Sequence, residues 1–169
     1  MQVKVKRLHV DAIIPTYATD GSGCFDIYAT NVHKATLAEL AVLKKFSNGL
    51  DTGQMGTQSI IPGQYVVFDT GLAFEIPKDH VMLVFSRSSH GFKSNTRLAN
   101  CVGVIDSDYR GELMVKLTRD SKYGSSMEIK TGDRIAQAMI VPIPKVTFEE
   151  VEELSETERG EGGLGSTGS

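Results

Sequence analysis

The chain has 169 residues, enough for one domain with a substantial apolar core and few for two. It carries 18 Lys and Arg against 21 Asp and Glu, a formal net charge of −3, which argues against the basic surface of a nucleic-acid-binding protein. No stretch approaches the roughly 20 apolar residues that span a bilayer. The first ten residues also lack the apolar core of a secretory signal. We therefore expect a soluble, cytoplasmic protein that binds neither nucleic acid nor membrane.

Most of the chain consists of short apolar runs separated by Gly, Pro, Asp and Ser. These runs are rich in Val, Ile, Phe and Tyr, which indicates strands. They lie at 3–6, 65–68, 72–76, 81–85, 113–117 and 135–141. Short strands with so few helices between them predict an all-β fold, as in a sandwich, a jelly roll or a barrel, rather than a parallel sheet with crossover helices.

One helix is predicted, from Thr36 to Asn48. Thr36 and Glu39 form a capping box, in which each side chain accepts a hydrogen bond from a backbone N–H at the helix start. Apolar residues follow at helical spacing, and Gly49 provides a stop. The next stretch, up to Ser59, is predicted to be a loop. A helix packed on the β-domain is favoured, and an interaction element is the alternative.

The segment Asn100–Glu112, NCVGVIDSDYRGE, predicts a β-hairpin with two carboxylates and one aromatic ring near its end. Asp108 is explained as a turn residue that caps local N–H groups, and Tyr109 as ordinary hairpin packing. Asp106 follows an apolar strand, where a carboxylate needs a partner or a chemical task. Asp106 is therefore the first candidate catalytic residue.

The terminal stretch 155–169 has one large apolar side chain, Leu164, and cannot form a core by itself. A disordered terminus is the simple interpretation. The alternative is a flexible phosphate clamp, because the guanidinium donors of Arg159 match phosphate oxygens and Ser166 and Thr167 add hydroxyls. The stretch has no Lys and precedes no helix, so it is not a P-loop.

Five motifs occur in the order found in trimeric dUTP diphosphatases (dUTPases), the family that the sequence resembles. They are GSGCFDIYA at 21–29, SRSSHG at 86–91, NCVGVIDSDYRGE at 100–112, GDRIAQ at 132–137 and RGEGGLGSTG at 159–168. The resemblance implies a jelly-roll domain over 1–154, a mobile closing tail over 155–169, and a homotrimer with shared active sites. It also implies Mg²⁺-dependent hydrolysis of dUTP to dUMP and pyrophosphate, which limits uracil incorporation into DNA and supplies dUMP for thymidylate synthesis.

The resemblance assigns roles at the base and the sugar. Asp106 would hold the attacking water and touch the deoxyribose 3′-OH, while the ring of Tyr109 would lie under the sugar and exclude a 2′-OH. Asn100, with backbone groups of 103–106 and Met114, would recognise uracil. The residues expected to contact substrate are Arg87, Ser88, Ser89, Asn100, Gly103, Val104, Ile105, Tyr109, Met114, Gln137, Arg159, Leu164, Gly165, Ser166 and Thr167.

The remaining roles concern the triphosphate. Arg87, Ser88 and Ser89 would bind phosphate from a neighbouring subunit, and Gln137 would add another contact. Asp26 would hold the hydration shell of Mg²⁺ through water, with the ion carried mainly by the triphosphate. The tail around Arg159 would close over the γ-phosphate.

Three positions depart from the family pattern. Leu164 stands where the family has Phe, so it can cover the base but offers no flat ring for stacking. Ser86 replaces the Pro before Arg87, and Cys24 replaces a Gly. The segment 31–59 is expected to be an insertion compared with compact family members, and it is a candidate surface for a protein partner.

Two other functions are weighed. A deoxycytidine triphosphate deaminase would share the fold, but Asp106, Asp108 and Tyr109 follow the diphosphatase pattern and the closing tail is present. A nucleotide-gated regulatory protein could keep the same nucleotide site and bind a partner through 31–59. The sequence leaves this second alternative open.

Overall fold

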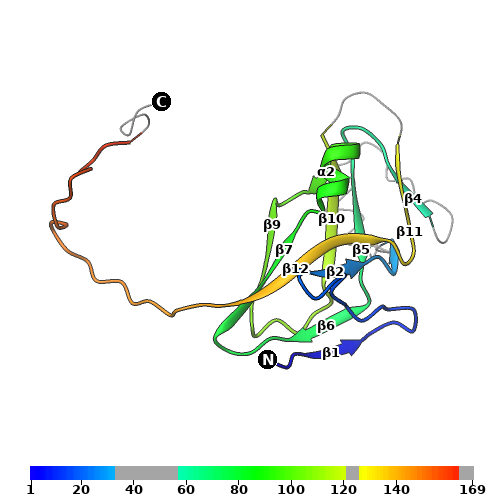
Figure 1. Ribbon diagram of the computed structural model, residues 1–169, viewed down its shortest axis with the longest axis horizontal. Coiled ribbons are helices and arrows are strands. Elements are labelled where there is room, and N and C mark those ends of the chain that lie inside the picture. Colours follow the sequence, from blue (N-terminus) through cyan, green and yellow to red (C-terminus); the bar gives the residue numbers. More distant parts are fainter. Residues whose placement is uncertain (33–56, 121–125, 164–169) are drawn as a thin grey trace, which may run out of the picture.

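The computed structural model of the chain describes residues 1–32, 57–120 and 126–163. Strands dominate this part, and they gather into one body from which the C-terminal stretch extends (Figure 1). The predicted helix Thr36–Asn48 and the end of the tail, 164–169, lie outside the described residues. No described helix is long and apolar enough to cross a membrane.

The first sheet is antiparallel and has its longest strand in the interior. Its order is β2 (Phe25–Tyr28), β12 (Arg134–Pro142), β7 (His80–Phe85) and β9 (Val102–Ile105). In β12, Ile135, Ala136 and Ala138 are fully buried. Such burial accounts for the nearly continuous apolar run in the sequence, since an interior strand has little contact with water.

The second sheet shows the alternation of a half-buried strand. Its order is β3 (Asn31–Val32), β5 (Tyr65–Asp69), β10 (Met114–Arg119) and β8 (Thr96–Leu98). In β10, Val115 and Leu117 point into the core while Met114 and Lys116 are exposed. Because successive side chains of a strand point to opposite faces, this pattern fixes the register of β10.

Smaller elements complete the body. One two-stranded sheet pairs β1 (Lys4–Arg7) with β6 (Leu72–Glu75), and another pairs β4 (Thr57–Ile60) with β11 (Met127–Lys130). The helix α2 (Ser88–Ser94) follows β7 and leads directly into β8.

The inner faces of the two large sheets share one core. Ile27 and Met82 come from the first sheet, Phe68 and Leu117 from the second, and all four are at most 1% exposed. Burying a side chain of this size contributes about 1.5–3 kcal/mol relative to leaving it in water. The all-β prediction is confirmed.

Two local predictions are wrong. The segment Asn100–Glu112 is not a hairpin, because β9 pairs with β7 in the first sheet whereas β10 pairs with β5 and β8 in the second. The chain changes sheets just before β9, where Cys101 takes the left-handed φ of 64°. The predicted loop up to Ser59 ends too late, since β4 already begins at Thr57.

Candidate functional site

A pocket of about 250 Å³ opens between β9 and β10, which belong to different sheets and do not pair with each other. Among the described strands, β9 forms an edge of its sheet, so backbone N–H and C=O groups on one side remain free of β7. The pocket thus presents backbone donors and acceptors along one wall. Its lining is Val84, Leu98, Ala99, Asn100, Gly103, Val104, Ile105, Leu113, Met114, Val115 and Lys116.

Gly103 allows this pocket to have its shape. It pairs with Val84 in the neighbouring strand, and a Cβ built on it would lie 3.2 Å from the Val84 Cβ and 3.8 Å from the Asn100 amide nitrogen. A larger residue would crowd β7 and reach the Asn100 side chain. Five of the six positions predicted to recognise the base line this pocket, and the sixth, Asp106, follows directly after it in the chain. The five are Asn100, Gly103, Val104, Ile105 and Met114.

Asp106 and Tyr109 lie in the loop just beyond β9. Asp106 is exposed, and its carbonyl oxygen accepts a hydrogen bond from the Tyr109 N–H at 3.2 Å. The Tyr109 hydroxyl donates to the carbonyl oxygen of Glu112 at 2.9 Å, while the residue stays 42% exposed. The carboxylate and the ring are therefore both available to a ligand at the end of this pocket.

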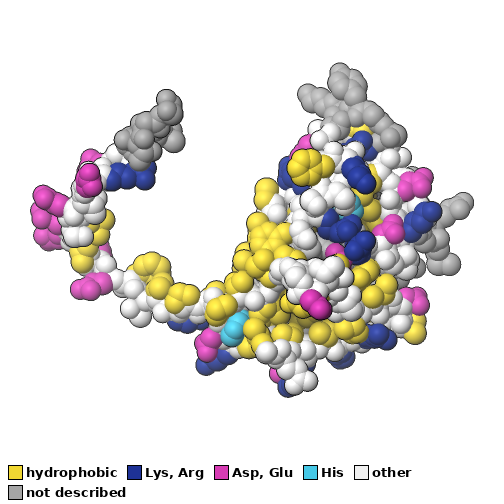
Figure 2. Space-filling view, viewed as in Figure 1, with side chains coloured by type: hydrophobic (Ala, Val, Ile, Leu, Met, Phe, Trp, Pro, Cys, Tyr) yellow, Lys and Arg dark blue, Asp and Glu magenta, His cyan; other side chains and the backbone are white. Residues whose placement is uncertain are grey.

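A second group of predicted residues gathers around Asp26. The Arg134 guanidinium donates to Asp26 Oδ2 at 3.1 Å, and Arg87 Nε lies 3.5 Å from Asp26 Oδ1. Gln137 pairs with Asp26 across β12 and β2, and its amide nitrogen donates to the Ser86 carbonyl at 3.0 Å. Side chains of Lys and Arg gather on the face near α2 (Figure 2). The cluster has the positive character that a polyphosphate requires.

The departure at Ser86 has a local explanation, whereas nothing in the structure explains Cys24 in place of Gly. The Ser86 hydroxyl accepts a hydrogen bond from the Leu98 N–H at 2.9 Å, which joins the end of β7 to β8 and which a proline could not accept with its side chain. Burial, and then the nearby Asp26 carboxylate, raises the pKa of the Cys24 thiol. Cys24 therefore stays protonated and is a poor nucleophile.

The segment predicted to bind phosphate includes a buried histidine that sequence reasoning did not single out. His90 follows Ser88 and Ser89 in α2 and is 7% exposed. Burial, reinforced by the Arg87 guanidinium and opposed by Asp133, lowers the pKa of His90 to about 4. His90 is therefore neutral near pH 7.

The predicted catalytic carboxylate of Asp106 and the guanidinium of Arg87 lie at opposite ends of β7. In the pairing of β7 with β9, Met82 stands opposite Ile105 and Phe85 opposite Val102. Asp106 follows one end of this ladder and Arg87 the other, so about 20 Å of strand separates them at 3.3 Å per residue. One copy of the chain does not bring the predicted catalytic carboxylate to its own phosphate-binding arginine.

The tail runs away from the body and from both groups. Beyond β12 the described part of the tail has neither helix nor strand, and Figure 1 shows it extending outward. Arg159 bonds only locally in the described structure, its Nε donating to the Gly162 carbonyl at 2.9 Å. Leu164, Gly165, Ser166 and Thr167 lie outside the described residues.

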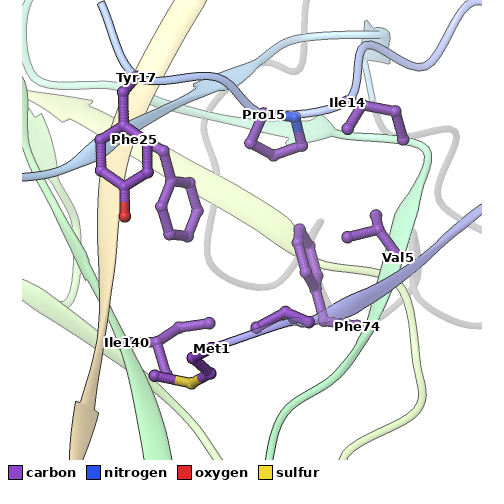
Figure 3. A pocket seen from close by; sticks show the side chains of 9 residues that line it. Met1, Val5, Ile14, Pro15, Tyr17, Phe25, Phe74 and Ile140 are labelled. Atoms are coloured by element: carbon purple, nitrogen blue, oxygen red, sulfur yellow. The ribbon is translucent and has the colours of Figure 1, made fainter. Parts of the chain in front are cut away.

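A larger apolar groove of about 430 Å³ lies elsewhere, beside β1 and β6. Met1 and Ile140 form one end, and Tyr17 packs edge-on against Phe25 at a centroid distance of 5.9 Å (Figure 3). None of the predicted site residues lines this groove. Its lining side chains are apolar apart from the Tyr17 hydroxyl, so the groove has few side-chain groups that could orient a nucleotide.

Comparison with known proteins agrees with this arrangement. The family model for dUTPase matches residues 44–168. The deoxyuridine 5′-triphosphate nucleotidohydrolase of Nautilia profundicola is 39% identical over 168 residues, covering 99% of both chains, and that of Dictyoglomus turgidum is 36% identical with the same coverage. The chain belongs to the dUTPase family.

Solved dUTPases share the fold. A variant of the dUTPase of Staphylococcus bacteriophage 80alpha, with dUpNHpp, superimposes with a TM-score of 0.76 at 26% identity and covers 99% of both chains. Because the bacterial relatives align from end to end, the segment 31–59 is not an insertion relative to them. Its described parts, β3 and β4, pair with β5 and β11.

The residues around Asp26 suit Mg²⁺ only if the ion is held mainly by the phosphate groups of a ligand. No group of three or more His, Cys, Asp or Glu side chains within the described ranges could hold a metal. Asp26 supplies one buried carboxylate, and both of its oxygens already face a guanidinium. Mg²⁺ keeps several waters and commonly binds through one or two carboxylates and substrate phosphates, which suits a role for Asp26 through water.

Sequence reasoning missed two further residues at the candidate site. Arg134 belongs to the quoted motif GDRIAQ, but only the structure shows that it pairs with Asp26. Glu112 ends the motif around Asp106, and its carboxylate accepts the Gly71 N–H at 2.6 Å. Both contacts join residues far apart in sequence, so no local pattern could have revealed them.

Proposed function

We propose that this chain hydrolyses dUTP at the α-phosphorus, releasing dUMP and pyrophosphate. The observation that carries the proposal is the pocket between β9 and β10, with Asp106 and Tyr109 beside it, in a member of the dUTPase family. The relatives from Nautilia profundicola and Dictyoglomus turgidum carry the same activity in their names.

The base is selected by the free edge of β9. Uracil presents an N3–H donor between two carbonyl acceptors, and a strand edge offers alternating C=O and N–H groups at fixed positions. Cytosine carries an amino group at C4 and no N3–H, so it would leave donors and acceptors of the pocket unpaired. Unpaired buried polar groups give strong discrimination. The Asn100 side chain lies beside Gly103, and Met114 of β10 also lines the pocket.

Hydrolysis needs a water held in line with the scissile bond. The Asp106 carboxylate orients this water and accepts its proton as the oxygen attacks the α-phosphorus, and pyrophosphate leaves with the electron pair of the broken P–O bond. The exposed Tyr109 ring lies under the deoxyribose and leaves no room for a 2′-OH. Asp106 also meets the 3′-OH, so binding and chemistry share one carboxylate.

The triphosphate is neutralised by groups from a second copy of the chain. Arg87 and the hydroxyls of Ser88 and Ser89 lie too far from Asp106 in one copy, which supports a homotrimer with sites between subunits. Gln137 adds an amide donor beside them. Mg²⁺, held by the triphosphate and by Asp26 through water, would neutralise charge that otherwise repels the attacking oxygen. Arg134 would hold Asp26 in place.

The apolar surfaces support an assembly. Phe148 is 96% exposed and Leu154 86% exposed on the described tail, and the groove beside β1 is also apolar. Exposed apolar surface of this kind indicates contact with another chain. A tail that crosses to a neighbouring copy can bring Arg159, Ser166 and Thr167 to the γ-phosphate, where Leu164 covers the base.

The experiment is pyrophosphate release from the purified chain with dUTP, dCTP, dTTP and UTP, each with and without Mg²⁺. We expect rapid release from dUTP only, and only with Mg²⁺. Conversion of dCTP to dUTP would instead indicate the deaminase. Tight binding of dUTP without turnover would favour the nucleotide-gated regulator, whose partner surface at 31–59 stays a prediction.

A further inference from the structure

The side chain of Glu112 ties the loop after β9 to the core. Its Oε1 accepts a hydrogen bond from the Gly71 N–H at 2.6 Å, and the residue is half-buried. Gly71 presents this N–H from a fixed position, because its φ is +66° and a Cβ there would lie 2.8 Å from the Cβ of Ala12. The carboxylate therefore binds a donor that has little freedom to move.

The next residue strengthens this attachment. The Leu113 N–H donates to the Leu72 carbonyl at 2.8 Å, and the Thr70 hydroxyl donates to the Leu113 carbonyl at 2.7 Å. Residues 112 and 113 are thus held at three points by the turn between β5 and β6. The bond from Glu112 is the only one of the three made by a charged group, which makes it the strongest candidate anchor.

The Tyr109 ring rests on this anchored segment. Its hydroxyl donates to the Glu112 carbonyl at 2.9 Å, and the ring folds over Gly111, where a Cβ would lie 2.6 Å from the ring carbon that bears the hydroxyl. Within the described residues this bond is the only one that the ring hydroxyl makes, and the residue is 42% exposed. Because the ring hydroxyl is bonded to the Glu112 carbonyl, the position of the Tyr109 ring above the loop depends on the position of the Glu112 backbone.

We infer that Glu112 is a positioning residue that sets the height of the Tyr109 ring and, through it, the preference for deoxyribose over ribose. The inference rests on the proposed function, in which this ring lies under the sugar. The Glu112 carboxylate is bonded to the Gly71 N–H and does not line the pocket beside Asp106. A ring displaced by a fraction of an ångström either admits a 2′-OH or loses its contact with the deoxyribose, and misplacements of this size are costly in catalysis.

The test compares the ratio of kcat/KM for dUTP to kcat/KM for UTP in the full chain. Glu112→Ala removes the anchor, and we expect the ratio to fall about tenfold, as expected for a loosened contact group. Glu112→Gln is the matched control. Its amide oxygen can accept the same N–H, so we expect its ratio to stay within about threefold of the wild type.

Gly111→Ala gives an independent arm that leaves Glu112 intact. The added methyl overlaps the Tyr109 ring in an exposed loop, so the ratio should fall while the thermal unfolding midpoint changes little. If Glu112→Ala does not fold, Glu112→Asp takes its place, because the shorter side chain withdraws the carboxylate from the Gly71 N–H, and we expect the same fall in the ratio. If Glu112 served folding alone, its loss would lower the thermal unfolding midpoint. It would reduce kcat/KM for dUTP and UTP by the same factor, and the ratio between them would stay unchanged.

The two proposals fail differently. A wild-type chain that cleaves dUTP, with ratios in Glu112→Ala and Gly111→Ala within about twofold of wild type, would overturn this inference and leave the proposed function standing. A wild-type chain that cleaves no dUTP would overturn both.

Discussion

The carboxylate of Asp106 is the group on which turnover should depend most. In Asp106→Asn the amide keeps the shape but cannot accept the proton of the attacking water, so we expect kcat to fall by about 10²–10⁴, the usual contribution of a general base. Binding of a non-hydrolysable dUTP analogue should change modestly, through the 3′-OH contact. Single-turnover kinetics and calorimetric titration measure the two effects. Turnover within a few-fold of wild type would remove Asp106 from this role.

Buried His90 predicts a pH-dependent stability. Its folded-state pKa of about 4 lies below its ordinary value of 6.5, so the unfolded chain binds more protons between these two values. The contribution of neutral His90 to the free energy of unfolding is fully present above pH 6.5 and is lost progressively as the pH falls towards 4. The nearby Arg87 acts in the same direction as burial, while Asp133 opposes it.

The measurement is the thermal unfolding midpoint at pH 7.0 and 5.5 for wild type and His90→Leu. We expect a larger drop in the wild type, because the leucine variant has no group to protonate at this position. Equal drops in the two proteins would show that another group sets the pH dependence in this range.

Sequence patterns predicted strands well where burial follows a simple period. The alternation that ends at Leu117 in β10 and the apolar run of β12 both gave correct strands, since β10 buries one face and the middle of β12 is buried on both. The short strands β8 and β11 carry no comparable pattern. The false hairpin at Asn100–Glu112 shows a second limit: strand pairing depends on tertiary contacts that a local motif does not contain.

The candidate site shows the same division. The polar residues of the motifs could be named from the sequence, because their chemistry is visible in the residue types. Their supports, Glu112 and Arg134, depend on contacts with Gly71 and Asp26 that join distant segments. The resemblance to dUTPases, more than periodicity, connected the motifs to one another.

The tail yields a prediction of its own. Truncation before Arg159 should leave the fold and the assembly unchanged, because the described residues of the tail from 159 to 163 make only local bonds. Turnover should fall sharply, since water exclusion and neutralisation of the γ-phosphate are lost together. Light scattering and pyrophosphate release measure the two properties. Full activity with the assembly preserved would show that the tail is an ordinary disordered terminus.

The molecule as a whole must be more than one chain if this account is correct. Asp106 lies at one end of the β7–β9 ladder, and Arg87 with Asp26 lies at the other. Two half-sites about 20 Å apart cannot act on one α-phosphate, given 3.3 Å per residue of strand. Complete sites then form where one copy's pocket meets another copy's arginine.

Mixed assembly of two inactive variants tests this claim most directly. Arg87→Ala and Asp106→Asn chains are unfolded together, refolded as mixtures, and assayed for pyrophosphate release from dUTP beside each variant refolded alone. We predict activity in the mixture well above that of either parent, because some interfaces combine an intact Asp106 with an intact Arg87. A mixture that forms mixed trimers and stays as inactive as its parents would contradict the shared site.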